Sequence, residues 1–177
     1  MKILITGASR GIGLACAKKY LEMGHEVYGI DIRPAGLEDA RYHHFVADIT
    51  GVLPEIEGVE ILVNNAGVQE GGREIEVNLQ GTIAVTEKYG IQPAIRSILF
   101  MASSSASNGA EFPLYAASKG GMVTYMKNVA LRIAQYDATS NSLSAGGVKT
   151  ELNQHILDSP ELMRQVLDET LLRRWAE

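Results

Sequence analysis

The chain has 177 residues, 46% of them hydrophobic and 21% charged, which suits one globular domain with a substantial core. Its net charge of −5 gives no electrostatic reason to expect a nucleic acid or an anionic membrane as partner, and no apolar run is long enough to span a bilayer. The single cysteine, Cys16, excludes an intrachain disulfide and is expected to be a structural thiol. Met1 leads directly into a strand pattern rather than a signal peptide, so we expect a cytoplasmic protein.

Apolar segments of strand length alternate with helical periodicity along the whole chain. Strands are expected at 3–5, 26–30, 42–47, 61–63, 97–102 and 138–143. Helices are expected at 14–23, in part of 50–57, at 75–90, at 114–135 and within 149–174. The alternation predicts an α/β fold with a doubly wound parallel sheet in three α/β/α layers, as a single domain over residues 1–177.

A glycine-rich turn joins the first expected strand to the first helix. Glycines let the backbone approach a pyrophosphate, and the helix start offers free N–H groups with a partial positive charge. Asp31 ends the second strand, where a carboxylate can accept hydrogen bonds from a ribose diol. This unit predicts a dinucleotide-binding (Rossmann) fold whose cofactor contacts include Gly7, Ser9, Arg10, Gly11, Ile12, Gly13 and Asp31.

Two side chains in the expected helix at 114–135 form a candidate acid–base pair. Tyr115 and Lys119 are four residues apart, so a helix points them the same way. A nearby ammonium favours the phenolate and lowers the pKa of a tyrosine. Tyr115 is therefore a candidate general base for an alcohol and general acid for a carbonyl.

Four motifs, in order along nearly the whole chain, resemble those of the single-domain branch of the short-chain dehydrogenase/reductase family. They are the turn Thr6–Gly13, then Asn64-Asn65-Ala66-Gly67, then Val77-Asn78-Leu79, and last Tyr115-Ala116-Ala117-Ser118-Lys119. The resemblance implies hydride transfer between a secondary alcohol and a ketone, with Asn78, Tyr115 and Lys119 catalytic. It also implies that Asn65, Ala66 and Gly67 border the cofactor, and that Tyr115 and Lys119 contact it.

The family's catalytic serine follows the fifth strand, where this chain has three consecutive serines. Matching the strand 97–102 onto the family's strand puts Ser103 in the catalytic position, with Ser104 as the alternative. Farther along, Val148 and Thr150 resemble the residues that meet the nicotinamide carboxamide, although Ala145 stands where proline is usual.

The cofactor is expected to be NAD rather than NADP. The carboxylate of Asp31 repels a 2′-phosphate, whereas Arg10 and Arg33 are the two side chains that could meet one. Asp48 and Ile49 resemble the pair that borders the adenine ring, with a turn or helix-capping role as the alternative for Asp48. No metal is expected, because the histidines show no ligand spacing.

The chain departs from the family pattern at two places besides Ala145. The interval from Gly67 to Asn78 is short, and the sequence stops before the family's last helix and strand. Either the sequence is a fragment or a reconstruction, or segments were omitted, or a partner covers the open edge of the last strand. The segment 149–174 resembles the family's substrate lid, and the helices at 75–90 and 114–135 resemble its homodimer or homotetramer contacts.

Three further functions compete with the oxidoreductase. A nucleotide-binding or regulatory protein without turnover would keep the fold. A dehydratase or epimerase on nucleotide sugars would usually space its glycines differently, and an acyl-carrier ketoreductase would want NADPH, which Asp31 disfavours. We expect a small alcohol or ketone as the substrate.

Overall fold

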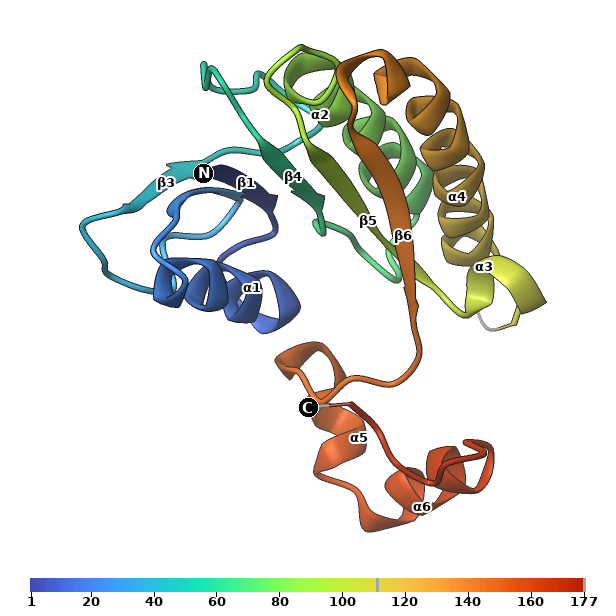
Figure 1. The fold of residues 1–177 in the computed structure, drawn as a ribbon. Helices are drawn as coiled ribbons and strands as arrows, with labels where there is room; N and C mark the ends of the chain where they lie inside the picture. The colour runs from blue at the N-terminus through green and yellow to red at the C-terminus, as the bar shows by residue number, and fades with distance from the viewer. Residues whose placement is uncertain (111, 177) are drawn as a thin grey trace. The chain divides into compact units, whose positions relative to one another are not determined.

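The computed structural model describes residues 1–110 and 112–176, which divide into two compact units with a boundary after Ser144. The first unit is built on a six-stranded sheet with the order β3-β2-β1-β4-β5-β6 (Figure 1). Its strands are β1 (Lys2–Thr6), β2 (Glu26–Asp31), β3 (Tyr42–Val46), β4 (Ile61–Asn64), β5 (Ser97–Ser103) and β6 (Thr139–Ala145). β1 pairs in parallel with β2 and β4, β2 with β3, and β4 with β5, which confirms the predicted doubly wound sheet.

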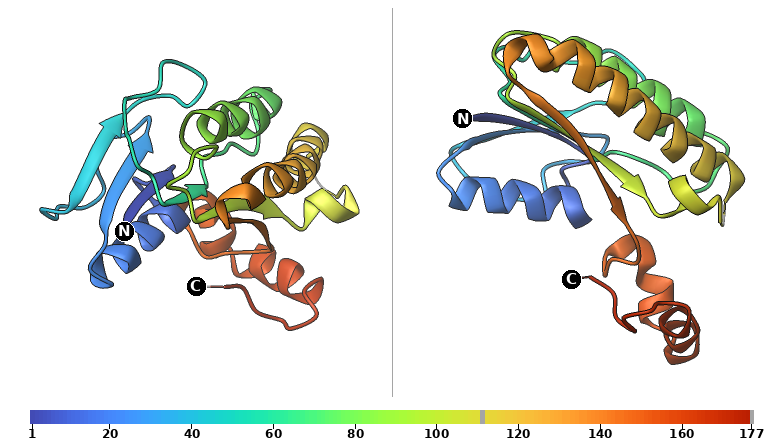
Figure 2. Two further views of the ribbon diagram at one scale, coloured as in Figure 1. Left: turned by 45° about the horizontal axis from the view of Figure 1, so that its top comes forward. Right: turned by 45° about the vertical axis from the view of Figure 1, so that its right-hand side comes forward.

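Helices cover both faces of this sheet. α1 (Gly11–Glu22) lies on one face, and α2 (Thr82–Tyr89) and α4 (Pro113–Ile133) lie on the other (Figure 2). Shorter elements complete the unit: the π-helix η1 (Ile75–Gly81), α3 (Ser105–Asn108) and the 3₁₀-helix η2 (Ala134–Tyr136). The three-layer architecture predicted from the alternating pattern is therefore confirmed.

Alternation along β1 divides the apolar core between the two faces. Leu4 packs in the cluster that includes side chains of α2 and α4, whereas Ile3 and Ile5 pack in the cluster that includes Ala17 and Leu21 of α1. All three β1 side chains are completely buried. A strand buried on both faces reads as a continuous apolar run, which is why this segment was recognisable from sequence.

The prediction of a helix in part of 50–57 is wrong, because this segment is a loop without helix or strand. Leu53 and Ile56 are buried in the core from this loop. Its carbonyl groups accept hydrogen bonds from side chains instead of from a helical backbone: Lys88 Nζ donates to Leu53 O at 3.0 Å, and Tyr89 OH donates to Pro54 O at 2.6 Å. Pro54, which lacks an N–H, also disfavours a helix here.

The helix expected at 75–90 is present, but its first seven residues form the π-helix η1 rather than an α-helix. Asn78 lies in this π-helix and is completely buried. A π-turn widens the helix and shifts the direction of the side chains within it, and such turns occur often at functional sites. Periodicity in the sequence did not reveal this local change.

The second unit contains η3 (Glu151–Asn153), α5 (Gln154–Leu157) and α6 (Pro160–Asp168), in agreement with helical segments expected within 149–174. Its two ends are paired, because Val148 forms a parallel bridge with Ala176 and Lys149 N donates to Ala176 O at 2.9 Å. Trp175 packs on Gly147 so closely that a Cβ there would lie 2.2 Å from the indole.

Candidate active site

The glycine turn forms a cradle at the start of α1. Gly7 and Gly11 have positive φ angles of 67° and 51°, which favour glycine. A Cβ on Gly13 would lie 2.0 Å from Gly7 O, so only glycine fits that position without a shift. Among the described residues no side chain caps the start of α1, where Arg10 is exposed. The cradle therefore suits a pyrophosphate at a helix N-terminus.

Thr6 and Asn65 join this cradle to the end of β4. Thr6 Oγ1 accepts from the backbone N–H groups of Asn65 and Ala66, both at 3.1 Å. Asn65 Nδ2 in turn donates to Thr6 O and Gly7 O, both at 3.0 Å. The Asn65 side chain thus fixes the turn, and its contact with a cofactor, like those of the other predicted residues, stays a prediction.

The carboxylate of Asp31 lies beside the turn. Its Oδ2 accepts from Ser9 N and its Oδ1 from Arg33 N, each at 3.0 Å. Ser9 Oγ donates to Arg33 O at 3.2 Å. Both Arg33 and Arg10 are exposed. The structure therefore brings the predicted ribose-binding acid and the predicted phosphate-binding turn together.

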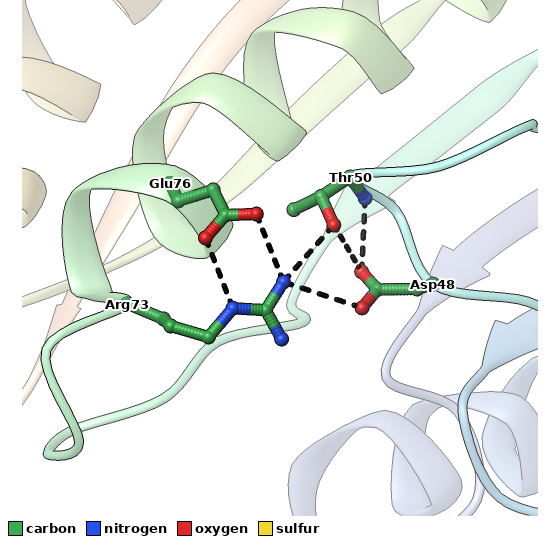
Figure 3. Close-up of polar contacts among 4 residues, drawn as sticks. All are labelled: Asp48, Thr50, Arg73 and Glu76. Carbon is green, nitrogen blue, oxygen red and sulfur yellow. Dashed lines mark hydrogen bonds and ion pairs between the residues drawn. The ribbon is translucent and has the colours of Figure 1, made fainter.

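Asp48 closes a turn after β3, where it also contacts the loop before η1 (Figure 3). Its Oδ1 accepts from Thr50 N at 2.9 Å and Thr50 Oγ1 at 2.8 Å, and Arg73 Nη2 lies 3.5 Å from its Oδ2. The backbone hydrogen bond from Thr50 lowers the pKa of Asp48. Arg73 also binds both carboxylate oxygens of Glu76 at 2.9 Å. The carboxylate thus has the turn-closing role that was one of two alternatives, and an adenine contact of Asp48 or the buried Ile49 stays a prediction.

Lys119 is a buried ammonium on α4. Its side chain is 4% exposed, its Nζ donates to Met101 O at 2.7 Å, and the same atom lies 5.6 Å from the centroid of the Tyr115 ring. Burial lowers the pKa of Lys119 to about 8. Pro113 occupies the first turn of the helix that carries both side chains. The predicted acid–base pair is therefore brought together on one side of α4.

Asn78 meets this pair from η1. Its Oδ1 accepts from Val68 N at 2.7 Å, and its Nδ2 donates to Val68 O at 2.8 Å and to Ser118 Oγ at 3.0 Å. A Cβ on Gly67 would lie 3.0 Å from Asn78 Oδ1 and 3.6 Å from Lys119 Nζ. The amide and the ammonium therefore converge beside Gly67, where a side chain would separate them.

The serine run after β5 has one buried candidate at the predicted position. Ser103 is buried, whereas Ser104 is exposed. Ser103 Oγ accepts from Ser105 N at 3.2 Å and lies 3.3 Å from Ser105 Oγ. Ser103 also follows Met101, whose carbonyl holds Lys119, by two residues, so it ends the strand that anchors the lysine. This placement favours Ser103 over Ser104.

The remaining predicted cofactor residues, Val148 and Thr150, lie in the second unit and stay predictions. Three supporting groups were not predicted from the sequence: Thr6 at the cradle, Ser105 at Ser103, and Ser118 at Asn78. Thr6 and Ser118 lie inside the motifs themselves. A polar residue between motif positions could therefore have indicated a supporting hydrogen bond. Ser105 offered no signal within a run of serines.

Comparisons with known proteins show which family the chain belongs to. Residues 1–161 match the sequence model of the family described as short chain dehydrogenase. Cyclopentanol dehydrogenase of Comamonas sp. (strain NCIMB 9872) is 30% identical over 211 aligned positions, covering 99% of this chain and 84% of that protein. 2-(R)-Hydroxypropyl-CoM dehydrogenase of Xanthobacter autotrophicus (strain ATCC BAA-1158 / Py2) is 30% identical and covers 93% of this chain and 81% of that protein.

Solved structures support the fold at lower identity. 4-Hydroxyisoleucine dehydrogenase complexed with NADH has a TM-score of 0.86 at 24% identity, covering 99% of this chain and 85% of that chain. Aldohexose dehydrogenase of Thermoplasma acidophilum has a TM-score of 0.83 at 23% identity, covering 99% of this chain and 81% of that chain. No helix in the described part of the chain is both long and apolar enough to cross a membrane.

Proposed function

The chain belongs to the short-chain dehydrogenase family of nicotinamide-dependent oxidoreductases, and we propose that it interconverts a secondary alcohol and a ketone with NAD as its cofactor. The observation that carries this proposal is that Asn78 and Lys119 meet beside Gly67, and that Lys119 Nζ lies 5.6 Å from the centroid of the Tyr115 ring. When bound, the nicotinamide accepts or supplies the hydride. The chain's own residues hold the cofactor, orient the substrate oxygen and move its proton.

Tyr115 moves the proton in this mechanism. Its hydroxyl donates a proton to the carbonyl oxygen in reduction, and its phenolate removes a proton from the alcohol in oxidation. The Lys119 ammonium stabilises the phenolate form. Since burial lowers the pKa of Lys119 to about 8, the lysine itself can also exchange a proton near neutral pH. Asn78 binds both backbone groups of Val68 and the hydroxyl of Ser118, the residue before the lysine, and Ser103 donates a hydrogen bond to the substrate oxygen.

The preference for NAD is proposed from the surroundings of Asp31. The glycine cradle fits a pyrophosphate, and the carboxylate beside it can accept hydrogen bonds from a ribose diol. A 2′-phosphate at the same place would meet a like charge. The two arginines nearby, Arg10 and Arg33, are exposed and do not neutralise Asp31 through a hydrogen bond of their side chains in the described structure.

The relatives suggest where to begin with substrates. Cyclopentanol dehydrogenase is named for a cyclic secondary alcohol, so cyclopentanol and cyclopentanone belong in the first panel, together with open-chain secondary alcohols. We also propose that the protein self-associates through α2 and α4. Light scattering coupled to size exclusion gives the oligomeric state, and a monomer would contradict that part of the proposal.

The decisive test is Tyr115→Phe, assayed for turnover and for NADH binding. Removing a general acid–base group is expected to lower turnover by a factor of about 100 or more while NADH binding is kept. Tyr125→Phe is the matched control, because Tyr125 lies on the same helix but bonds Glu87 on α2. Full turnover in Tyr115→Phe would refute the mechanism. NADH binding by the wild-type protein without turnover of any substrate would favour the nucleotide-binding alternative.

A further inference from the structure

Both backbone polar groups of Arg33, its N–H and its carbonyl, are hydrogen-bonded. Its N–H donates to Asp31 Oδ1, and its carbonyl oxygen is 2.8 Å from His44 Nε2 and accepts from Ser9 Oγ. Ser9 N in turn donates to the other oxygen of Asp31. The edge strand β3 therefore contributes a side chain to the same hydrogen-bonded set that fixes Asp31 beside the glycine turn.

The direction of the hydrogen bonds at His44 follows from its partners. A carbonyl oxygen only accepts, so Nε2 carries the proton that is donated to Arg33 O. Nδ1 is then the acceptor for Tyr42 OH, 2.9 Å away. Burial, with a smaller contribution from Asp31, raises the pKa of Tyr42 to about 12, so its hydroxyl remains a donor at neutral pH. Tyr42 OH therefore donates to His44 Nδ1, and His44 Nε2–H donates to Arg33 O.

The Tyr42 hydroxyl packs against Gly29 of β2, where a larger residue would not leave room for it. A Cβ on Gly29 would lie 2.2 Å from Tyr42 OH and 3.0 Å from Ala8 Cβ. Gly29 is also the residue paired with His44 in the β2–β3 register. Tyr42 and His44 are two residues apart on the strand, so both side chains point to the face on which the glycine turn lies.

We propose that His44, oriented by Tyr42, is a positioning residue that sets the choice of cofactor. It holds the backbone of Arg33 through the Arg33 carbonyl, and Arg33 N–H in turn holds the Asp31 carboxylate. In this position the carboxylate accepts an unphosphorylated ribose and repels a 2′-phosphate. The inference rests on the proposed NAD function and names the residues that enforce it. Loss of the His44 hydrogen bond leaves Ser9 Oγ as the side-chain donor to the Arg33 carbonyl and loosens the segment between Asp31 and Arg33. The carboxylate is then held less firmly, and the exposed guanidinium of Arg33 gains access to a 2′-phosphate.

Fragment binding isolates this end of the cofactor. The dissociation constants of 5′-AMP and 2′,5′-ADP, which differ only in the 2′-phosphate, are measured by isothermal titration calorimetry. The wild-type protein is expected to prefer 5′-AMP. In His44→Leu this preference should fall about fivefold, which is the factor that one ordinary hydrogen bond contributes. His44→Gln, which keeps a side-chain N–H for the Arg33 carbonyl, should retain most of the preference.

A matched control lies next to the proposed residue. His43 is adjacent on β3 but points to the opposite face, where its Nε2 is 3.0 Å from Glu26 Oε1. His43→Gln should keep the wild-type preference, and thermal melts show whether each variant is folded. A merely structural role of His44 would weaken both fragments equally and leave their ratio unchanged.

The outcomes separate this inference from the proposed function. A wild-type protein that prefers 2′,5′-ADP refutes the NAD proposal itself. A wild-type preference for 5′-AMP that persists unchanged in folded His44→Leu overturns the role of His44. If His44→Leu does not fold, Tyr42→Phe takes its place, since it removes only the hydroxyl that orients the imidazole; an unchanged ratio there overturns the inference in the same way.

Discussion

Replacing Lys119 by methionine is expected to remove catalysis and to stabilise the fold. The lysine is 4% exposed and its ammonium donates to Met101 O, and burial lowers its pKa from 10.5 to about 8. That shift means that the folded protein disfavours the charged form. Methionine fills a similar volume without a charge. A residue proposed to act in catalysis therefore carries a stability cost that its removal should reveal.

The magnitude follows from the size of the shift. With a folded pKa of about 8 and an unfolded value of 10.5, burying the ammonium costs about 3 kcal/mol at pH 7. The lost hydrogen bond to Met101 offsets about 1 kcal/mol of the gain, which leaves about 2 kcal/mol in favour of the variant. Between the two pKa values the unfolded chain binds a proton that the folded chain has released, so the cost shrinks as pH rises, to about 1 kcal/mol at pH 9.5.

Urea unfolding of both proteins at pH 7 and pH 9.5 tests this prediction. The free energy of unfolding of Lys119→Met should exceed that of the wild type at pH 7, and the excess should largely disappear at pH 9.5. Taking the difference between the two proteins cancels groups that titrate in both. Lys127→Met, at an exposed position of the same helix, is the control for losing a lysine that stays in water. A variant that is less stable than the wild type by the same amount at both pH values would refute the reasoning.

Three further substitutions probe the supports of the site. Ser118→Ala removes the acceptor for Asn78 Nδ2 and should lower the free energy of unfolding by about 1–2 kcal/mol in urea, with a reduced turnover; unchanged values in both assays would contradict the role given to this hydroxyl. Gly13→Ala places a Cβ 2.0 Å from Gly7 O and should cost about 1–3 kcal/mol in urea and weaken NADH binding in a fluorescence titration, whereas a wild-type affinity would show that the cradle tolerates a side chain. Gly147→Ala should displace the chain's single tryptophan and shift its fluorescence emission, and an identical spectrum would speak against that packing.

Strands and long helices could be predicted because their patterns depend on burial. The run Ile3-Leu4-Ile5 is apolar since both faces of β1 are covered, and a helix packed on one face repeats its apolar residues with a fixed period. The prediction of a helix in part of 50–57 was wrong because it also relied on a pattern of buried residues. Leu53 and Ile56 are buried as helix residues would be, but side chains of α2 satisfy the loop's carbonyls. Partners so distant in the sequence leave no periodic signal.

In the candidate site, too, features set by neighbouring residues could be predicted from the sequence, whereas features set by distant residues could not. The spacing of Tyr115 and Lys119 predicts their common direction, because helix geometry alone decides it. The choice between Ser103 and Ser104 depended instead on which residue ends β5 facing inward, which adjacent identical residues cannot indicate. The π-helix around Asn78 was equally inaccessible, since one additional residue in a helical turn changes no residue type.

Backbone groups hold most of the functional side chains of this site. Lys119 is held by the carbonyl of Met101, Asn78 by both backbone groups of Val68, and Asp31 by the N–H groups of two residues. Every residue type except proline offers the same backbone groups, so the supporting positions can change identity without moving the side chain that they hold. Relatives that are only 30% identical match nearly the whole chain, which is consistent with supports of this kind. Other supports are side-chain donors and acceptors, which a substitution can remove; they include Thr6, His44 and Ser118. Substitutions at these positions of this chain are therefore expected to change cofactor choice or turnover while the proposed catalytic residues stay in place.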